Sequence, residues 1–269
     1  GDIAGDRFAD LAKAAPFQVC SLHLSNEARK SSSLAELAAC FIRAIEEHQP
    51  EGAVYVGGHS FGCVMAFEIA LQLERAGRKV GGVVLGDMEV TWPPIDPRRT
   101  GANWAGARAE AVKLFSLIQV RGEGANADDR IAERLKILSR ETTHDGPLTP
   151  EELAVYEKRA YYTFSASKMN KAQFDSFVDP LERNLGFLND ITVLDGKPHE
   201  PSSVLRAPVL HILAGVDSSE FAGAPDINKR FCSEELVVVP VSANHFTMMH
   251  RPAVADTVTA VLTHSMKDA

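Results

Sequence analysis

The sequence is short of positive charge. Its 269 residues include 28 lysines and arginines against 36 aspartates and glutamates, which gives a formal net charge of −8 at pH 7. A chain with this balance is not attracted non-specifically to nucleic acid or to anionic membranes. We therefore expect partners that are neutral or that meet a local basic patch, and no nucleic acid among them.

Long apolar runs are also missing. No segment approaches the roughly 18 uninterrupted apolar residues that a transmembrane helix needs. The segment from Gly1 to Asp10 has neither the basic start nor the apolar core of a signal peptide. The sequence thus predicts a cytoplasmic protein without a membrane-bound segment.

Cysteine is scarce and scattered. The four cysteines, Cys20, Cys40, Cys63 and Cys232, lie far apart and form no Cys-x-x-Cys pair. This spacing argues against a disulfide framework and against a zinc site, and it suits free thiols in a reducing compartment. We expect no bound metal.

What the sequence does contain is an alternation of short apolar runs and helical patterns. With 45% hydrophobic and 24% charged residues, it has the composition of a globular protein with a sizeable core. Ser33 and Glu36 form a capping-box pattern at the start of one helix, and Gly77 follows the end of another. The expected strands are 17–24, 53–58, 80–86, 207–213 and 236–241, and the expected helices are 34–48, 63–76 and about 253–266. This order predicts a mostly parallel sheet with helices on both faces.

A long stretch interrupts the alternation. Residues 88–206 separate two predicted strands, whereas a strand-to-helix loop usually has about 2 to 6 residues. Helical patterns occur inside it at about 104–118, 128–140, 150–165 and 171–188. We predict a core made of residues 1–91 and 205–269, and a large helical lid inserted at 92–204.

One motif is typical of nucleophilic catalysis. Residues 58–62 read Gly-His-Ser-Phe-Gly and match Gly-x-Ser-x-Gly between a predicted strand and a predicted helix. In that context a sharp turn exposes the serine hydroxyl above the sheet, as in the α/β-hydrolase fold. The motif predicts Ser60 as the nucleophile and the amide of Phe61, at the helix N-terminus, as one oxyanion donor.

A serine nucleophile needs a base and an acid, expected in the chain order Ser, Asp or Glu, His. His245 lies between the last strand and the last helix and is the predicted base, whereas His59 and His250 are interpreted as structural. Asp87 and Asp217 each follow a predicted strand. Sequence spacing alone does not choose between them as the acid.

At this point the chain resembles the thioesterase domains that end polyketide synthases, fatty acid synthases and nonribosomal peptide synthetases. The matching segments are 57–77 (GGHSFGCVMAFEIALQLERAG), 81–87 (GGVVLGD) and 244–249 (NHFTMM). The resemblance implies an α/β-hydrolase fold and a substrate carried on the phosphopantetheine arm of an acyl carrier protein. It places the acid at Asp87 in chain-releasing members and at Asp217 in the stand-alone editing branch. The His-Phe-Thr-Met-Met segment favours Asp87.

The chain departs from this family in two places. Ala243-Asn244 stands where members carry Gly-Asp or Gly-Asn before the histidine. Members also have a buried strand and a glycine-containing loop ahead of the segment that matches Phe8 to Leu11. We expect this chain to be part of a longer polypeptide that includes the carrier protein, with a gap beside the nucleophile strand. The second oxyanion amide is then expected within residues 1–3, at Ile3.

The expected function is a serine thioesterase that releases an acyl or polyketide chain by hydrolysis or cyclisation, with no cofactor of its own. The alternatives are an editing thioesterase, a general carboxylesterase and, from another class, a catalytically silent binding module. A lid over the strand ends would line the acyl chamber. The candidate lining residues are Trp104, Phe115, Tyr161 and Phe164, and the candidate carrier-docking clusters are Arg98 with Arg99 and Lys168 with Lys171.

Overall fold

The computed structural model divides the chain into two compact units. One unit comprises residues 1–94 and 198–269, and the other comprises residues 95–197. The residues described are 8–91, 108, 111–112, 151, 154–155, 158, 170–192, 199–215, 222–234, 236–245, 247–250 and 252–264. The role of residues 92–204 as a lid stays a prediction.

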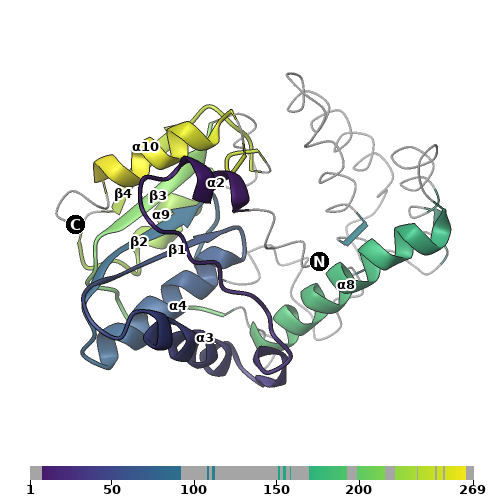
Figure 1. The fold of residues 1–269 in the computed structure, drawn as a ribbon, viewed down its shortest axis with the longest axis horizontal. Helices are drawn as coiled ribbons and strands as arrows, with labels where there is room; N and C mark the ends of the chain where they lie inside the picture. Colours follow the sequence, from purple (N-terminus) through teal and green to yellow (C-terminus); the bar gives the residue numbers. More distant parts are fainter. Residues whose placement is uncertain are drawn as a thin grey trace. The chain divides into compact units, whose positions relative to one another are not determined.

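The first unit is built on a parallel sheet of four strands in the order β1-β2-β3-β4 (Figure 1). The strands are β1 (Val54–His59), β2 (Val80–Gly86), β3 (Val209–Ala214) and β4 (Leu236–Val241). His59 pairs with Gly86, and Gly86 pairs with Ile212. The carboxyl ends of the first three strands therefore lie side by side, which is where open α/β sheets bind ligands.

Helices cover both faces of this sheet, as predicted. On one face α4 (Gly62–Arg75) packs on β1 and β2, and α3 (Leu34–His48) packs on α4. On the other face α10 (Val254–His264) packs on β3 and β4, and α2 (Ala9–Ala14) packs on α10 (Figure 1). The short helices η1 (Ala28–Lys30) and α9 (Ala224–Lys229) complete the unit. The chain thus has the predicted α/β-hydrolase-like arrangement of a parallel sheet between helices.

Local sequence signals set the start of α3 and the end of α4. The Ser33 hydroxyl accepts a hydrogen bond from the Glu36 amide at 3.2 Å, a cap that stabilises a helix by about 1 kcal/mol. The Glu36 carboxylate returns to Ser32 instead of Ser33. At the end of α4, Gly77 has φ +79°, and the amides of Gly77 and Arg78 donate to the carbonyls of Glu74 and Leu73. This is a Schellman motif, and it needs a glycine at the left-handed position.

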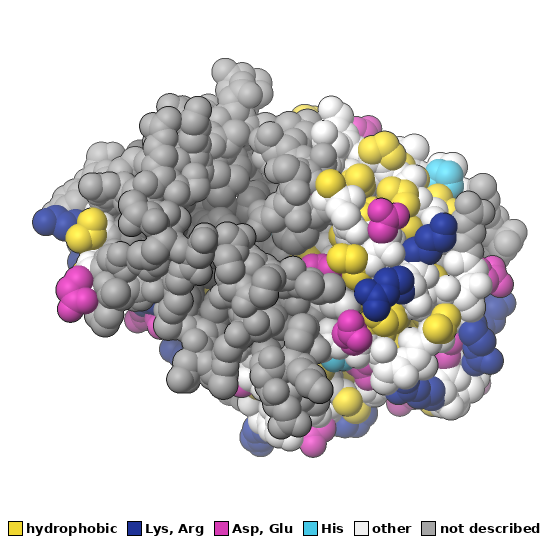
Figure 2. All heavy atoms as spheres, turned by 180° about the vertical axis from the view of Figure 1, so that it is seen from behind, with side chains coloured by type: hydrophobic (Ala, Val, Ile, Leu, Met, Phe, Trp, Pro, Cys, Tyr) yellow, Lys and Arg dark blue, Asp and Glu magenta, His cyan; other side chains and the backbone are white. Residues whose placement is uncertain are grey.

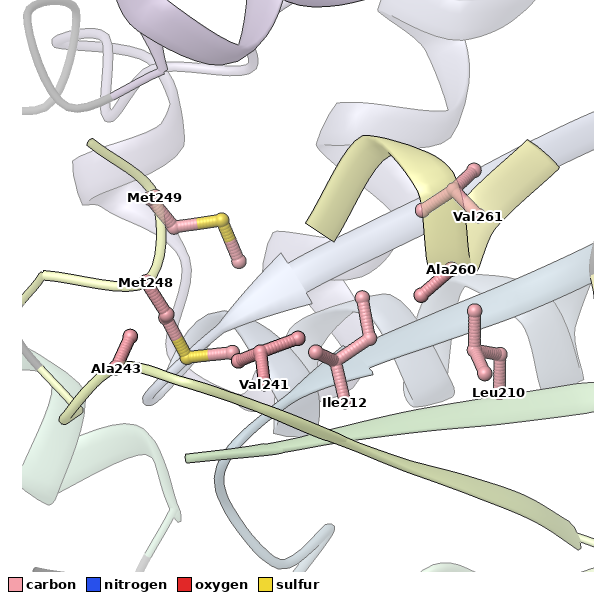
Figure 3. Packing of buried hydrophobic residues seen from close by; sticks show 8 residues of the cluster. All are labelled: Leu210, Ile212, Val241, Ala243, Met248, Met249, Ala260 and Val261. Atoms are coloured by element: carbon pink, nitrogen blue, oxygen red, sulfur yellow. The ribbon is translucent and has the colours of Figure 1, made fainter. Parts of the chain in front are cut away.

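The core beside α10 reaches the loop that follows β4. Figure 3 shows the two methionines of this loop pointing toward the sheet, next to side chains from β3, β4 and α10. Met248 is fully buried and Met249 nearly so. The cluster comprises Leu210, Ile212, Val241, Ala243, Met248, Met249, Ala260 and Val261. Burial of two methionines stabilises the loop by several kcal/mol, at about 1.5 to 3 kcal/mol for each side chain.

One predicted strand is wrong. Phe17 to Leu24 forms no ladder with any described residue, and most of its side chains are exposed or half-buried. A β-branched and aromatic run becomes a strand only where a neighbouring strand can satisfy its backbone and a core can cover one face. In the part of the chain that the structure describes, β1 pairs with β2 alone, so this run meets no such neighbour.

In the second unit the described helix is α8 (Lys171–Thr192), which includes the predicted 171–188 and extends beyond it. Asn170 and Gln173 exchange side-chain-to-backbone hydrogen bonds at its start. Arg108 binds Asp175 at 3.0 Å and Glu182 at 2.9 Å and also contacts Asp179. Within the described ranges, no helix is long and apolar enough to cross a membrane.

Candidate active site

Ser60 occupies a strained turn between β1 and α4. Its φ is +57°, a left-handed conformation that costs a non-glycine residue about 1 to 2 kcal/mol. The Ser60 amide donates to the Gly86 carbonyl at 3.0 Å, and the Cys63 amide donates to the Ser60 carbonyl at 2.8 Å. The turn is therefore fixed both to the end of β2 and to the first turn of α4.

The two glycines of the motif differ in their surroundings. A Cβ atom on Gly58 would lie 1.8 Å from the Gly62 carbonyl oxygen, so only glycine permits this approach of strand and helix. A Cβ atom on Gly62 would meet no described atom within 4 Å. Close backbone approach therefore requires a glycine at position 58 and not at position 62. Phe61 lies at the N-terminus of α4, where the helix dipole favours negative charge.

The structure brings together His245, the predicted base, and Asp87, the acid that the family resemblance favours. Asp87 follows β2 with φ +55° and is 2% exposed. Its Oδ1 atom accepts a hydrogen bond from the Ala214 amide at 2.8 Å, and its Oδ2 atom lies 2.9 Å from Nδ1 of His245. Because a carboxylate accepts, Nδ1 of His245 carries the proton, and Nε2 of the neutral ring is left as the basic nitrogen.

Hydrogen bonds between residues of the loop that carries His245 fix the shape of this loop. The amide of Asn244 donates to Oγ1 of Thr247 at 3.2 Å, and the amide of Thr247 donates to Oδ1 of Asn244 at 3.1 Å. Oγ1 of Thr257, in α10, donates to the Met248 carbonyl at 2.8 Å. Since Met248 and Met249 are also buried, the segment that follows His245 is anchored to the core.

His59, the neighbour of Ser60, also reaches this loop. Its Nε2 atom lies 2.7 Å from the His245 carbonyl oxygen. The two imidazole rings lie with centroids 4.7 Å apart and planes inclined by 33°. His59 therefore faces the loop that carries the predicted base, and its hydrogen bond to a backbone carbonyl is consistent with its structural interpretation. His250 contacts Asp10 of α2 at 3.6 Å, consistent with its structural interpretation.

A buried polar network behind Asp87 was not predicted. Asn228, in α9, is fully buried, accepts from the Val90 amide at 2.7 Å and donates to the Met88 carbonyl at 3.1 Å. Its Nδ2 atom also lies 3.0 Å from Nδ1 of His211, in β3. Desolvation lowers the pKa of His211 to about 4, although the nearby Asp87 charge opposes the shift. The network thus holds the turn that follows the acid, and Pro225 in the first turn of α9 was its one sequence signal.

Cys63 lies under the Ser60 turn. Its Sγ atom is 3.4 Å from the carbonyl oxygens of both Gly58 and Gly86. Burial raises the pKa of this thiol far above its ordinary value, so it stays protonated and unreactive. All four cysteines are free. Among the described residues, no group of three or more His, Cys, Asp or Glu side chains could hold a metal ion.

Several predicted site residues lie outside the described part of the chain. They are Ile3, Arg98, Arg99, Trp104, Phe115, Tyr161, Phe164, Lys168 and Asp217. Lys171 is described, and its ammonium pairs with Asp175. Its charge is therefore not available alone for docking. On the face shown in Figure 2, basic side chains of the described part are interspersed with acidic ones and form no continuous patch.

The relatives of this chain are large synthases. The chondramide synthase cmdD of Chondromyces crocatus is 27% identical over 83% of the chain, and the non-reducing polyketide synthase Dhc5 of Alternaria cinerariae is 40% identical over 27% of it. The aligned parts make up 5% and 3% of those proteins, so the chain spans only a small part of their length.

Solved structures show the same fold. The Vlm2 thioesterase domain, bound with a dodecadepsipeptide, aligns with a TM-score of 0.54 at 17% identity and covers 96% of this chain and 87% of that one. The thioesterase domain family matches residues 1–262, nearly the whole chain. The chain therefore belongs to the thioesterase domain family.

Proposed function

We propose that this chain is a serine thioesterase that releases an acyl or polyketide chain from the phosphopantetheine arm of a carrier protein. One observation carries the proposal. A serine in a strained strand-to-helix turn shares the carboxyl edge of the sheet with a buried aspartate that lies 2.9 Å from a half-buried histidine. Strained backbone of this kind is typical of active sites, and an aspartate that fixes a histidine tautomer is typical of acyl transfer.

In the proposed acylation, Oγ of Ser60 attacks the thioester carbonyl carbon while Nε2 of His245 takes the hydroxyl proton. The tetrahedral intermediate then breaks its carbon–sulfur bond, and His245 returns the proton to the departing thiolate. These steps leave the acyl group as an ester on Ser60 and a free thiol on the carrier arm. The ionised Asp87 stabilises the imidazolium between the two proton transfers.

The acyl-serine ester is then resolved by the same groups. A water molecule, or a hydroxyl or amine of the acyl chain itself, loses a proton to His245 and attacks the ester carbonyl. Collapse of the second tetrahedral intermediate returns the proton to Oγ of Ser60. Water yields a free acid, and an internal nucleophile yields a ring. The Phe61 amide, at the N-terminus of α4, is the proposed donor to the oxyanion in both halves. Ile3 remains the proposed second donor.

The proposed substrate carrier is an acyl carrier protein in the same polypeptide. The synthases that resemble this chain are many times longer than it is, which supports a chain that works beside other domains. The Vlm2 thioesterase domain binds a dodecadepsipeptide, which supports a fold that accepts large acyl chains. Arg98 with Arg99 remains a proposed docking cluster for the carrier. The weaker cluster is Lys168 with Lys171, because Lys171 pairs with Asp175.

Two alternatives make different use of the same residues. An editing thioesterase would use Asp217 as its acid, whereas the Asp87 to His245 hydrogen bond supports the chain-releasing branch. A catalytically silent binding module would not need a strained serine or a buried carboxylate, both of which cost stability. A general carboxylesterase would share the whole mechanism and differ only in its leaving group.

Active-site labelling and product analysis together test the proposal. A fluorophosphonate should label the wild-type chain at Ser60, and the Ser60→Ala variant should remain unlabelled. A panel of acyl thioesters of N-acetylcysteamine, read by product mass, should give free acids or rings from the wild type only. Absence of labelling with an intact fold would favour the silent module. Faster turnover of oxygen esters than of matched thioesters would favour a carboxylesterase.

A further inference from the structure

The structure joins the residue before the proposed nucleophile to the main chain of the proposed base. His59 is the last residue of β1 and is 6% exposed. Its Nε2 atom lies 2.7 Å from the carbonyl oxygen of His245. A carbonyl oxygen can only accept, so Nε2 of His59 carries a proton and donates it. The contact spans elements that are far apart in the sequence.

The two histidines donate hydrogen bonds from different ring nitrogens. His245 donates from Nδ1 to Asp87, and His59 donates from Nε2 to the backbone of His245. The Asp87 bond fixes the tautomer of the basic ring, but its carboxylate belongs to the end of β2. The His59 hydrogen bond instead connects the backbone of His245 to the end of β1, and Ser60 is the residue that follows β1. The ring contact at 4.7 Å supports the same alignment.

We propose that His59 is a positioning residue that sets the distance between Ser60 and the base His245. The inference rests on the proposed function, because it assigns a role relative to that nucleophile and base. Proton transfer between Oγ of Ser60 and Nε2 of His245 requires hydrogen-bond reach. A displacement of about 1 Å in such an arrangement can lower the rate about 10²-fold. His59 therefore governs the rate of acylation and not the affinity for the acyl chain.

Three substitutions separate the hydrogen bond from the packing. His59→Phe keeps a ring but loses the donor. His59→Gln places an amide nitrogen where Nε2 stands, and His59→Asn places one nearer to Nδ1, so only glutamine reaches the carbonyl. We expect His59→Phe and His59→Asn to lower the single-turnover acylation rate about 10²-fold with unchanged KM, and His59→Gln to recover most of it. The exposed His264→Gln variant is the matched control and should act like the wild type.

A double-mutant cycle distinguishes positioning from folding. If His59 acts through His245, then His59→Phe should have no further effect on acylation in a His245→Ala background, while thermal midpoints of the four proteins show that each is folded. Equal losses in both backgrounds, or equal rates for His59→Gln and His59→Asn, would overturn the inference. An unchanged rate in His245→Ala alone would instead overturn the proposed function. Loss in His245→Ala without loss in His59→Phe would refute only the role of His59.

Discussion

Replacement of Asp87 by asparagine tests the acid and base most directly, because the structure dictates how the new amide must sit. Asp87 has two buried partners, the Ala214 amide on Oδ1 and Nδ1 of His245 on Oδ2. An asparagine that turned its oxygen to His245 would point its NH₂ group at the Ala214 N–H. Two donors would then face each other in a buried site, at a cost of about 1 to 3 kcal/mol.

The favoured orientation therefore keeps the oxygen on Ala214 and points the NH₂ group at Nδ1 of His245. Nδ1 must then accept, so the ring proton moves to Nε2 and the lone pair needed by Ser60 is lost. In a serine protease the equivalent change lowers kcat about 10⁴-fold. A loss of this size is about 5 kcal/mol of transition-state stabilisation. We expect a similar loss for Asp87→Asn at an unchanged thermal midpoint.

The assay is the burst phase of acylation with an acyl thioester of N-acetylcysteamine, followed in a stopped-flow instrument. Asp217→Asn is the matched comparison, and its burst rate should stay within about tenfold of the wild type, since its carboxylate is not the proposed acid. If Asp87→Asn retained its burst and Asp217→Asn lost it, the acid would be Asp217 and the chain would belong with the editing branch.

Three further predictions concern stability. Ser60→Gly should be more stable than Ser60→Ala by about 1 kcal/mol in urea unfolding, because only glycine accepts φ +57° without strain; equal stabilities would contradict a strained turn. Gly58→Ala should cost about 3 kcal/mol or prevent folding, whereas Gly62→Ala should stay within about 0.5 kcal/mol, since only the first Cβ atom meets backbone, at 1.8 Å. Burial lowers the pKa of His211 from 6.5 to about 4. The unfolded chain therefore protonates His211 at a higher pH than the folded chain does, and stability decreases as the pH falls from 6.5 to about 4. Between pH 7 and pH 4 the wild type should lose about 3 kcal/mol more than His211→Asn, and parallel losses would refute this account.

Elements with strong local signals were predictable from the sequence. The helix that starts after Ser33 and the strand that ends before Asp87 have the bounds that periodicity and caps imply. The turn at Ser60 was predictable because a motif and its flanking elements agree. Each of these features depends on residues within a few positions of one another.

Features that depend on tertiary partners were not predictable in the same way. The run from Phe17 to Leu24 has strand composition, but no described strand pairs with it. The orientation of His59 depends on a carbonyl group 186 residues away in the chain. Asn228 holds the turn after Asp87 from a short helix whose periodicity is too brief to register. In each case the outcome depends on a segment that lies far away in the sequence.

The hydrogen bond from the Ala214 amide to Asp87 has an evolutionary consequence. Ala214 ends β3, and Asp87 follows β2, so the carboxyl ends of these two strands are one hydrogen bond apart. If an acid that follows β3 also reached His245, as the resemblance to the editing branch implies, two point substitutions would move the acid and leave the sheet and the histidine loop in place. The chain-releasing and editing branches would then be neighbouring solutions on a single scaffold. A revertible exchange of this kind offers a direct way to reconstruct their divergence in the laboratory.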